Sequence, residues 1–344
     1  MKPAMFILAG ILFVLLVYII ILSFYKGDYA REEIVFKSPG NYVSSIDTIH
    51  IMSWNIGYAG LDETMDFFYD GGEQVRTSRK CVQKNMNNII SFLRNQKNDI
   101  YLLQEIDKNS KRSHYTNQID ILNKKFMEYH SAFAMNYKTW HVPFPLRKPL
   151  GKVNSGLLTL SRNIPSKVVR HKLPGKYEWP KRLFMPQRCM LASHYTLTNK
   201  KELIVINIHL SAFDQGKLKK QEMEYIKNYA YKMYNRGHYI IIGGDWNQSP
   251  PGIQPNFKKY QKEINVQYIP ENDFPDEWKW AYDSGIPTNR SVKSPFDKNH
   301  TKTSVLDFYL ASPNVEIMHV QTIDLGFKYS DHHPVVASFV LFEF

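Results

Sequence analysis

Cysteine is scarce in this chain of 344 residues, which contains only Cys81 and Cys189. Two cysteines can form at most one bridge, so a fold built on a disulfide framework is excluded. Whether these two residues pair is left open by the sequence. Internal repeats with a period of about 20–50 residues are also absent, as are low-complexity tracts, which argues against a solenoid or a propeller.

Acidic residues are fewer than basic ones. The chain has 44 Lys and Arg against 32 Asp and Glu, which gives a formal net charge of +12. Lys2 is the only basic residue before residue 25, so the excess belongs to the rest of the chain. A basic surface attracts nucleic acid, and it equally attracts an anionic membrane. Charge alone therefore does not select a substrate.

Charged side chains are missing altogether from Ala4 to Phe24, and this apolar run is long enough to span a bilayer as a helix. The following residues lack a small-x-small cleavage pattern, so we expect an uncleaved anchor over 1–25 and a polar linker over 26–46. A cleaved signal and a secreted form are the alternative. The difference in basic residues between the two ends of the apolar run is small, so it does not fix the orientation of the helix. We place the rest of the chain outside the cytoplasm, because an anchor of this kind commonly exports the domain attached to it.

The remaining residues, 47–344, predict one domain of alternating short β-strands and a few helices. Several runs rich in Ile, Val, Leu and Tyr are typical of strands covered on both faces, at 48–54, 99–106, 155–161, 202–210, 238–246, 304–311 and 334–342. Apolar residues at helical spacing predict one helix after Ser78 and another before Gly237. The Pro- and Asn-rich stretch 250–303 is expected to form long loops over a site.

Polar residues follow these predicted strands at the positions where a ligand site forms in layered α/β proteins. They are Asn55, Glu105, Asn207, His209, Asp245, Asn247, Asp307, Asp331, His332 and His333. Any one of them has a structural explanation, such as a turn cap or a surface ion pair. Together they offer carboxylates, amides and imidazoles without a thiolate, a set that suits Mg²⁺ or Mn²⁺ better than structural zinc.

The ordered motifs "WN", "QE", "NIHL", "GDWN", "LDFYL" and "SDHHP" resemble those of the endonuclease/exonuclease/phosphatase superfamily, the DNase I-like fold. The resemblance covers about residues 48–344. It implies a four-layer α/β sandwich with two central mixed β-sheets flanked by helices, here preceded by one transmembrane helix. It also implies hydrolysis of a phosphate ester that depends on a divalent metal, with Mg²⁺ as the cofactor and Mn²⁺ as a substitute. The stretch 55–72 is similar to uncharacterised bacterial members.

The resemblance also assigns roles residue by residue. Glu105 would be the main metal ligand, with Asn55 close by and Asp331 completing the metal site. Asp245 would orient or deprotonate the attacking water, and Asn247 would hold a phosphate oxygen. His209 would contact the phosphate or help to protonate the leaving oxygen, and His332, held by Asp307, would stabilise developing charge.

A further set is expected to bind substrate. Arg112, Tyr115 and Asn117 follow the "QE" strand, Asn154 opens the strand beside the substrate, and Arg290 comes from the long loop. Asn207 would support the site by hydrogen bonding. For these residues a solvated loop or a purely structural role is an equally good interpretation.

The side chains of the two adjacent histidines are expected to point in opposite directions, because neighbouring residues on an extended strand point to opposite faces. Strict alternation would pair Asp331 with His333. The family pattern instead assigns Asp331 and His332 to the site, with a loop that turns into the strand at Pro334. His333 would then be a neighbour or a substrate contact.

The substrate stays open between nucleic acid and a phospholipid headgroup. Basic charge and abundant Tyr, Trp and Arg favour a nuclease, whereas membrane tethering favours a lipid phosphoesterase of the sphingomyelinase or phosphoinositide type. The stretches 140–151 and 273–282 could supply aromatic loops that face the membrane, although ordinary loop packing is the favoured interpretation of both. A binding module without catalysis would be expected to lack a motif residue, and none of Glu105, Asp245, Asn247 or His332 is missing.

Overall fold

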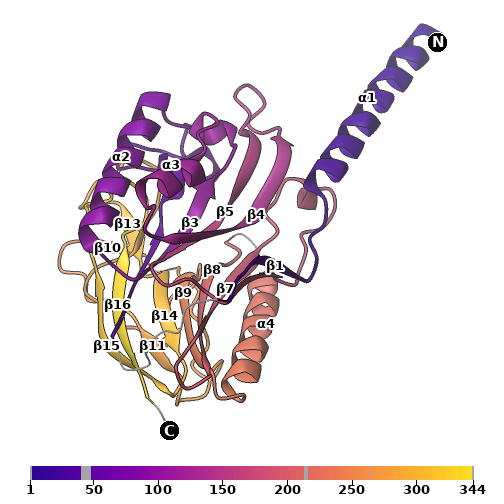
Figure 1. Cartoon of the computed structure of the whole chain (residues 1–344). Helices are drawn as coiled ribbons and strands as arrows, with labels where there is room; N and C mark the ends of the chain where they lie inside the picture. The colour runs from indigo at the N-terminus through magenta and orange to yellow at the C-terminus, as the bar shows by residue number, and fades with distance from the viewer. Residues whose placement is uncertain (1, 40–47, 213–215, 264, 343–344) are drawn as a thin grey trace.

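Two β-sheets packed face to face dominate the computed structural model, which describes residues 2–39, 48–212, 216–263 and 265–342 (Figure 1). The first has six strands in the order β15-β16-β2-β3-β5-β4. Its strands are β2 (Ile49–Asn55), β3 (Ile100–Asp107), β4 (His130–Val142), β5 (Gly151–Ser161), β15 (Val315–Thr322) and β16 (Val335–Leu341). Only β2 and β3 run parallel, so the sheet is mixed.

The second sheet has seven strands in the order β1-β6-β7-β8-β9-β14-β11. It contains β1 (Glu32–Lys37), β6 (Lys167–Lys172), β7 (Cys189–Thr196), β8 (Glu202–His209), β9 (Tyr239–Asp245), β11 (Lys279–Ala281) and β14 (Asp307–Ala311). β8 and β9 are parallel, and all seven residues of β9 are buried. Such full burial is what its continuous apolar sequence predicts.

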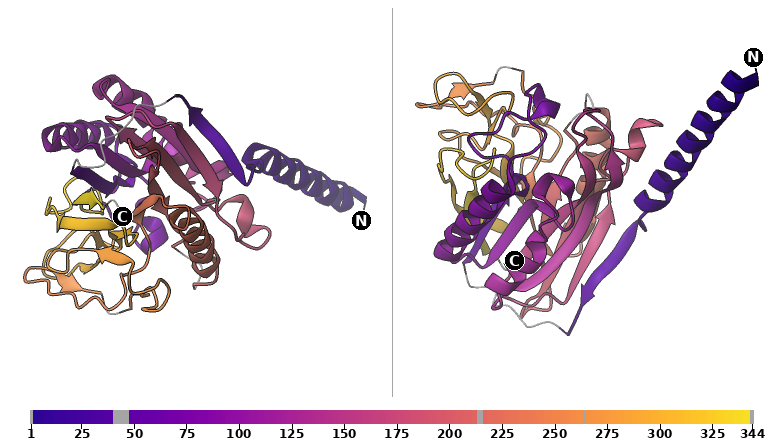
Figure 2. Two further views of the ribbon diagram at one scale, coloured as in Figure 1. Left: turned by 60° about the horizontal axis from the view of Figure 1, so that its bottom comes forward. Right: turned by 90° about the horizontal axis from the view of Figure 1, so that it is seen from above.

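Three longer helices flank the sheets and complete a four-layer sandwich (Figure 2). The helix α2 (Arg79–Gln96) starts at Ser78, whose hydroxyl accepts a hydrogen bond from the Cys81 amide. Both α2 and α3 (Gln118–Lys125) cover the outer face of the six-stranded sheet, and α4 (Lys217–Tyr234) covers the seven-stranded one. The predicted fold class is therefore confirmed.

Alternation along the central strands divides the core into layers. In β9, Ile240 and Ile242 pack toward α4, whereas Tyr239 and Ile241 pack toward the other sheet. The side chains between the sheets form a continuous apolar layer with Leu102, Val205 and Phe339. A residue's position along its strand therefore decides whether it faces a helix or the space between the sheets.

The stretch 250–303 contains more regular structure than expected. Here β10 (Gln261–Lys262), β12 (Asn289–Arg290) and β13 (Lys302–Ser304) form a small third sheet, and β11 extends the large one. Short 3-10 helices lie elsewhere, η1 (Gly57–Ala59), η2 (Phe68–Asp70), η3 (Lys111–Ser113) and η4 (Lys181–Leu183). Phe274 and Trp278 are buried against α4, so for these two aromatics the structure agrees with ordinary packing, the favoured interpretation of 273–282, and not with the membrane-facing alternative.

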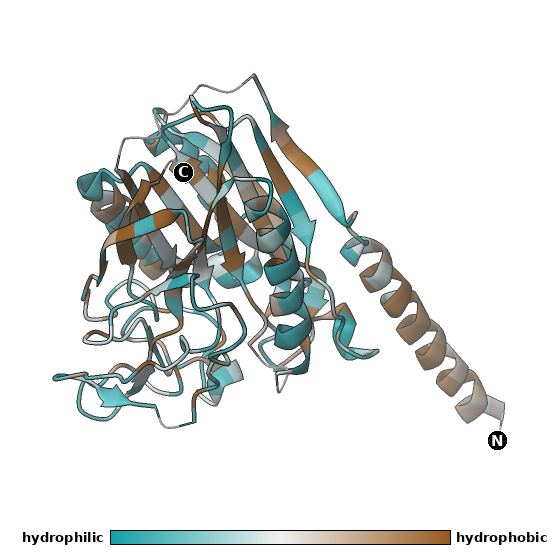
Figure 3. Ribbon diagram, turned by 90° about the horizontal axis from the view of Figure 1, so that it is seen from below, coloured by the Kyte–Doolittle hydropathy of each residue, from teal (hydrophilic) through white to brown (hydrophobic). Residues whose placement is uncertain are grey.

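The N-terminal helix α1 (Lys2–Lys26) projects from the sandwich and is apolar along most of its length (Figure 3). Residues Pro3–Lys26 are long and apolar enough to cross a membrane, and an 18-residue window within them has a mean hydropathy of 3.2 and is 6 % buried. Helices of signal sequences share these properties. The prediction of an apolar N-terminal helix is confirmed, whereas its membrane orientation stays a prediction.

The predicted linker over 26–46 requires a correction. Within it, Glu32–Lys37 form β1, which pairs antiparallel with β6 and so belongs to the seven-stranded sheet. The linker prediction rested on polar residues with Gly27, Pro39 and Gly40, a composition that an edge strand tolerates. Residues 40–46 of the predicted linker and residue 47 of the predicted domain lie outside the described residues.

Candidate active site

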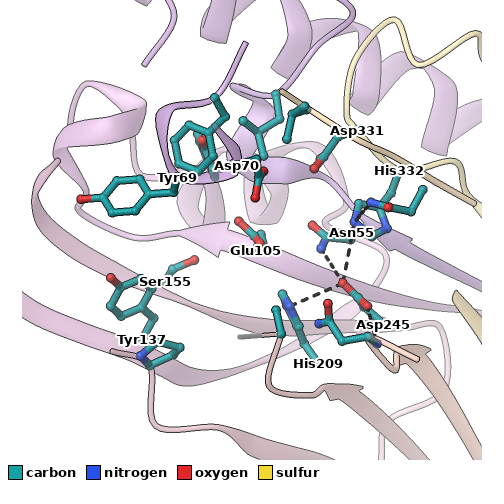
Figure 4. Close-up of a pocket in the computed structure, with 18 of the residues that line it drawn as sticks. Asn55, Tyr69, Asp70, Glu105, Tyr137, Ser155, His209, Asp245, Asp331 and His332 are labelled. Atoms are coloured by element: carbon teal, nitrogen blue, oxygen red, sulfur yellow. Dashed lines mark hydrogen bonds and ion pairs between the residues drawn. The ribbon is translucent and has the colours of Figure 1, made fainter. Parts of the chain in front are cut away.

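The predicted site residues lie at one edge of the sandwich, because the strands that carry them begin or end at that edge. The parallel pairs β2–β3 and β8–β9 end there, and the antiparallel strands β14 and β16 begin there. Asn55, His209, Asp245 and Asp307 share the strand faces that point between the sheets. Above them lies a cavity of about 500 Å³ (Figure 4).

Asp245 is the hydrogen-bonding centre of the cavity floor. Its Oδ2 accepts a hydrogen bond of 3.0 Å from Asn55 Nδ2, and its Oδ1 accepts one of 2.9 Å from the Asn247 amide. Burial raises the pKa of this carboxyl, but the charge of His332 and these hydrogen bonds outweigh it and the pKa is lowered. Asp245 is therefore an ionised acceptor, able to orient a water molecule.

His332 is held between two carboxylates. Its Nδ1 lies 2.7 Å from Asp307 Oδ2, and its Nε2 lies 3.8 Å from Asp245 Oδ2. Burial lowers the pKa of His332, but the two carboxylates raise it by more, to about 10. The ring is thus an imidazolium at neutral pH, a fixed positive charge at the cavity wall.

His209 has the opposite protonation state. Its Nε2 lies 3.4 Å from Asp245 Oδ2, but Arg188 Nη2 is only 3.1 Å away. Burial and the charge of Arg188 lower the pKa of His209 to about 3. A neutral ring can contact a phosphate oxygen through its N–H group, the first of the two roles predicted for His209.

Three carboxylates face the other side of the cavity, Asp70, Glu105 and Asp331, with Asn55 next to them (Figure 4). Burial, together with Asp331 and Glu105, raises the pKa of Asp70 to about 7. Burial also raises the pKa of Asp331 to about 6, with Glu105 adding to it and His332 opposing it. Negative charge is therefore crowded here, a condition that a cation relieves.

Glu105 reaches the cavity through a local break in its strand. Leu103 in β3 faces the helix side, so strict alternation would put Glu105 on that face too. A register shift between Leu103 and Ile106 and a φ of +57° at Glu105 turn its side chain toward the cavity instead. Such strain in a residue other than glycine is expected at functional sites.

The chemistry of this cluster fits a hard divalent cation. Glu105 Oε2 is buried and accepts no hydrogen bond, although Arg112 Nη1 lies 3.3 Å away as an ion pair. Carboxylate and amide oxygens are what Mg²⁺ and Mn²⁺ prefer. A second group, Asp245, Asp307 and His332, has ligand atoms within 4.8 Å of one another and could also hold an ion, but His332 and Asp307 already bind each other.

The predicted substrate-binding residues separate into two groups. Arg112 and Arg290 line the cavity, but Arg112 is engaged by Asp107 at 3.0 Å and Arg290 by the Asp62 carbonyl. The other five lie outside the cavity lining: Tyr115, Asn117, Asn154, Asn207 and His333.

Each of those five has a structural position that the sequence did not show. Asn117 caps α3, and Tyr115 is 54 % exposed beside it. Asn154 accepts a hydrogen bond from Tyr25, and Asn207 bonds Gln104 between the sheets at 2.8 Å. His333 is fully buried, a position that agrees with the first of its two predicted roles, a neighbour of the site, rather than with a substrate contact.

His333 is held on all sides away from the cavity. Its Nδ1 lies 2.8 Å from the Pro287 carbonyl, its Nε2 accepts a hydrogen bond from the Phe327 amide, and its ring stacks on Phe327 with centroids 3.8 Å apart. His332 and Asp331 face the cavity, as the family pattern implies.

Several cavity residues escaped sequence reasoning. Asp70 lies in η2, far from any predicted strand end, and Arg188 directly precedes β7, which was not predicted. Tyr58 lines the cavity with its hydroxyl buried and unbonded, and Arg112 stacks 3.8 Å above its ring centroid. In the sequence, only the stretch 55–72 could have pointed to cavity residues of this kind, since it contains both Tyr58 and Asp70.

The family of this chain follows from its similarity in sequence. A model of the Endonuclease/Exonuclease/phosphatase family matches residues 52–332. The chain belongs to this family. Its members are metal-dependent phosphoester hydrolases, and the chain is an enzyme of that class. No curated protein matches the sequence.

Solved structures of family members share the fold. An endonuclease/exonuclease/phosphatase from Beutenbergia cavernae aligns with a TM-score of 0.59 and 17% identity, over 86% of this chain and 72% of that one. The human Nocturnin catalytic domain with bound sulfate aligns at 0.54 and 14%, over 88% and 96%. TDP2 from Caenorhabditis elegans aligns at 0.50 and 13%, over 86% and 74%. At these identities the likeness extends to the fold alone.

Proposed function

We propose that this enzyme hydrolyses a phosphodiester by attack of water, with Mg²⁺ as the cofactor. The observation that carries the proposal is the arrangement of charge across one cavity. An imidazolium at His332 stands on one wall, the carboxylates of Glu105, Asp331 and Asp70 stand on the other, and the Asp245 carboxylate lies on the floor. A phosphate needs positive charge on its oxygens and an aligned nucleophile, and this cavity provides positions for both.

The metal would be held by Glu105 and Asp331, with Asn55 beside them. Bound there, it supplies positive charge for the phosphate oxygens and for the leaving oxygen. Two observations on the described residues support this position. None of these residues donates a hydrogen bond to the buried Oε2 of Glu105, and among them only the Gly57 amide donates to Asn55 Oδ1, at 3.0 Å. Manganese can substitute because it prefers the same oxygen ligands.

The residues of the floor have separate tasks. Asp245 orients the attacking water through its ionised carboxylate, and Asn55 fixes one of its oxygens. His332 donates to a phosphate oxygen, while Asp307 fixes the ring and preserves its charge. Asn247, whose Nδ2 donates to the Leu210 carbonyl at 2.9 Å, lies beside Asp245 and lines the same cavity, where it contacts the phosphate.

A substrate panel on the full-length protein in detergent micelles tests this function. Plasmid DNA, RNA, sphingomyelin, phosphoinositides and bis-p-nitrophenyl phosphate would be compared in Mg²⁺, in Mn²⁺ and in EDTA, with p-nitrophenyl phosphate as the monoester. We expect diester cleavage that EDTA abolishes and that Asp245→Ala lowers by at least about 10²-fold. Cleavage unaffected by EDTA, or of monoesters alone, would contradict the proposal.

A lipid substrate is a second candidate, and one observation favours it. Of the two stretches that could face a membrane, 140–151 carries exposed Trp140, Phe144 and Leu146 close to α1. Activity on sphingomyelin or phosphoinositide without cleavage of DNA and RNA would select this candidate. DNA cleavage alone would exclude it.

The membrane position is proposed along with the activity. We infer that α1 anchors the enzyme and that the sandwich lies outside the cytoplasm. Protease added to right-side-out and to inside-out membrane vesicles of the expression host would test this, because only the first should expose the sandwich. Release of the protein by alkaline carbonate would contradict the anchor.

A further inference from the structure

The connection between β4 and β5 carries exposed apolar side chains in a segment without acidic residues. From Trp140 to Gly151 the sequence reads "WHVPFPLRKPLG". Phe144 is 55 % exposed and Leu146 is 79 % exposed, and both Arg147 and Lys148 beside them are exposed. Large apolar side chains together with basic ones are the composition of surfaces that bind anionic membranes.

A second segment extends the same surface. Around η4, Trp179 is 58 % exposed, Lys176, Lys181 and Arg182 are exposed as well, and Glu178 is the one exposed acid among them. The two segments are joined, because Thr139 donates a hydrogen bond to the Leu183 carbonyl and Phe184 packs with Val142 and Leu150. We call these eight exposed residues the tip surface: Trp140, Phe144, Leu146, Arg147, Lys148, Trp179, Lys181 and Arg182.

The tip surface lies against the membrane-spanning candidate helix. The ring of Tyr18 in α1 lies 6.2 Å from that of Trp140, and Lys26 donates hydrogen bonds to the carbonyls of Arg182 and Met185. Tyr18 is eight residues before the end of α1, which is about 12 Å along the helix axis. A helix that crosses the bilayer would therefore bring Trp140 to the headgroup region, where Trp and Tyr are favoured.

The same segments form one side of the cavity described above. Leu150, Tyr177, Met185 and Pro186 line the cavity, and Tyr69, which also lines it, donates a hydrogen bond of 2.6 Å to the Phe144 carbonyl. Figure 1 shows α1 and the β4–β5 connection at the same end of the molecule. A bilayer in contact with the tip surface would thus lie beside the opening of the site.

We propose that the tip surface docks on an anionic phospholipid bilayer next to α1 and holds the opening of the site toward the headgroups. This inference rests on the proposed anchor but not on the proposed hydrolysis. The partner is identified by its chemistry, since an apolar interior takes Phe144 and Leu146 and an anionic surface takes the basic residues. Each Lys or Arg near such a surface favours docking by about fivefold.

A fluorescent label tests the docking directly in the full-length protein reconstituted into vesicles. With Cys81→Ser as background, Leu146→Cys would carry an environment-sensitive dye. Met127→Cys is the matched control, because Met127 is 85 % exposed but precedes the opposite end of β4. Vesicles would contain phosphatidylcholine alone or an equal mixture with phosphatidylglycerol, with and without a lipid-borne quencher.

We expect blue-shifted and quenched emission at position 146 and aqueous emission at position 127. The docked fraction at 146 should fall in phosphatidylcholine vesicles and in an Arg147→Glu, Lys148→Glu variant. Aqueous emission at 146 in protein that resists carbonate extraction would overturn the docking, and loss of integration would overturn the anchor with it. Hydrolysis of bis-p-nitrophenyl phosphate by the same sample reports on the proposed function independently.

Discussion

Nδ1 of His332 lies 2.7 Å from Oδ2 of Asp307, although Asp307 begins β14 of the seven-stranded sheet and His332 lies in the loop before β16 of the six-stranded sheet. Asp307 opens β14, opposite Asp245 on β9, so one antiparallel pair places both carboxylates around the ring. Between them the imidazole is held as a cation. The relationship ties the charge of the site to the packing of the two sheets.

Replacing Asp307 by Asn removes one of the two charges that keep His332 protonated. The hydrogen bond can persist, but the pKa of His332 should fall because an important cause of its elevation is gone. We expect kcat to fall by about 10²-fold at neutral pH and to recover in part at lower pH, as the ring regains its proton. A pH profile of kcat for both proteins measures this, and parallel profiles would contradict the role of Asp307.

The adjacent histidines should respond differently to alanine. His332→Ala should lower kcat per folded molecule by at least about 10²-fold, and it should also lower stability because Asp307 and Asp245 lose a buried cationic partner. His333→Ala should lower the free energy of unfolding by about 1–3 kcal/mol, because it removes a buried ring and two hydrogen bonds. Activity per folded molecule should then be retained. The reverse pattern would show that the two histidines were assigned to the wrong tasks.

Glu105→Gln should weaken metal binding by at least about 10-fold, because it removes an anionic oxygen from the proposed ligand set. Titration calorimetry with Mn²⁺ measures this without reference to activity. Glu128→Gln is the control, since it removes the same charge from an exposed position. Unchanged affinity in Glu105→Gln would move the metal toward Asp245 and Asp307.

Asp70→Asn tests the crowding of negative charge. At pH 8 and in EDTA the substitution should raise the thermal midpoint, since a carboxylate repelled by Asp331 and Glu105 is removed. Saturating Mg²⁺ should stabilise the parent more than the variant and reduce the difference. A lower midpoint in EDTA would mean that Asp70 supports the fold through contacts other than charge.

Acid should destabilise the enzyme partly through His171. Burial lowers the pKa of His171 to about 4, so the unfolded chain, with a pKa near 6.5, binds more protons between these values. Stability from this group is complete above pH 6.5 and is lost as the pH falls toward 4, by about 2 kcal/mol at pH 5. Urea unfolding in micelles should show a shallower pH dependence for His171→Gln. His300→Gln, where the side chain is 81 % exposed, should not change it.

Several strands and their polar ends were accessible from the sequence because they depend on local patterns. The apolar runs ending in Asn55, His209 and Asp245 predicted both the strands and their polar termini, and the structure brings these three residues to one edge. Parallel neighbours end together, so a local pattern is enough to predict the meeting of distant residues.

What the sequence could not supply depends on contacts between distant segments. Asn207 has the spacing of a site residue, yet two residues before His209 it lies between the sheets and bonds Gln104. Asp70 enters the site from an irregular segment whose course is fixed by the Phe67 amide bonding the Val292 carbonyl. Arg188 approaches His209 from the start of a strand with no distinctive pattern.

The pairing of β1 with β6 has a consequence for where the enzyme can work. Only residues 27–31 separate α1 from β1, a span of at most about 18 Å when fully extended. A catalytic domain joined to α1 by so short a segment stays within this distance of the end of the helix. With α1 in a membrane, as proposed above, substrates would have to reach the catalytic domain at the membrane surface, because the domain could not extend far into the surrounding solution.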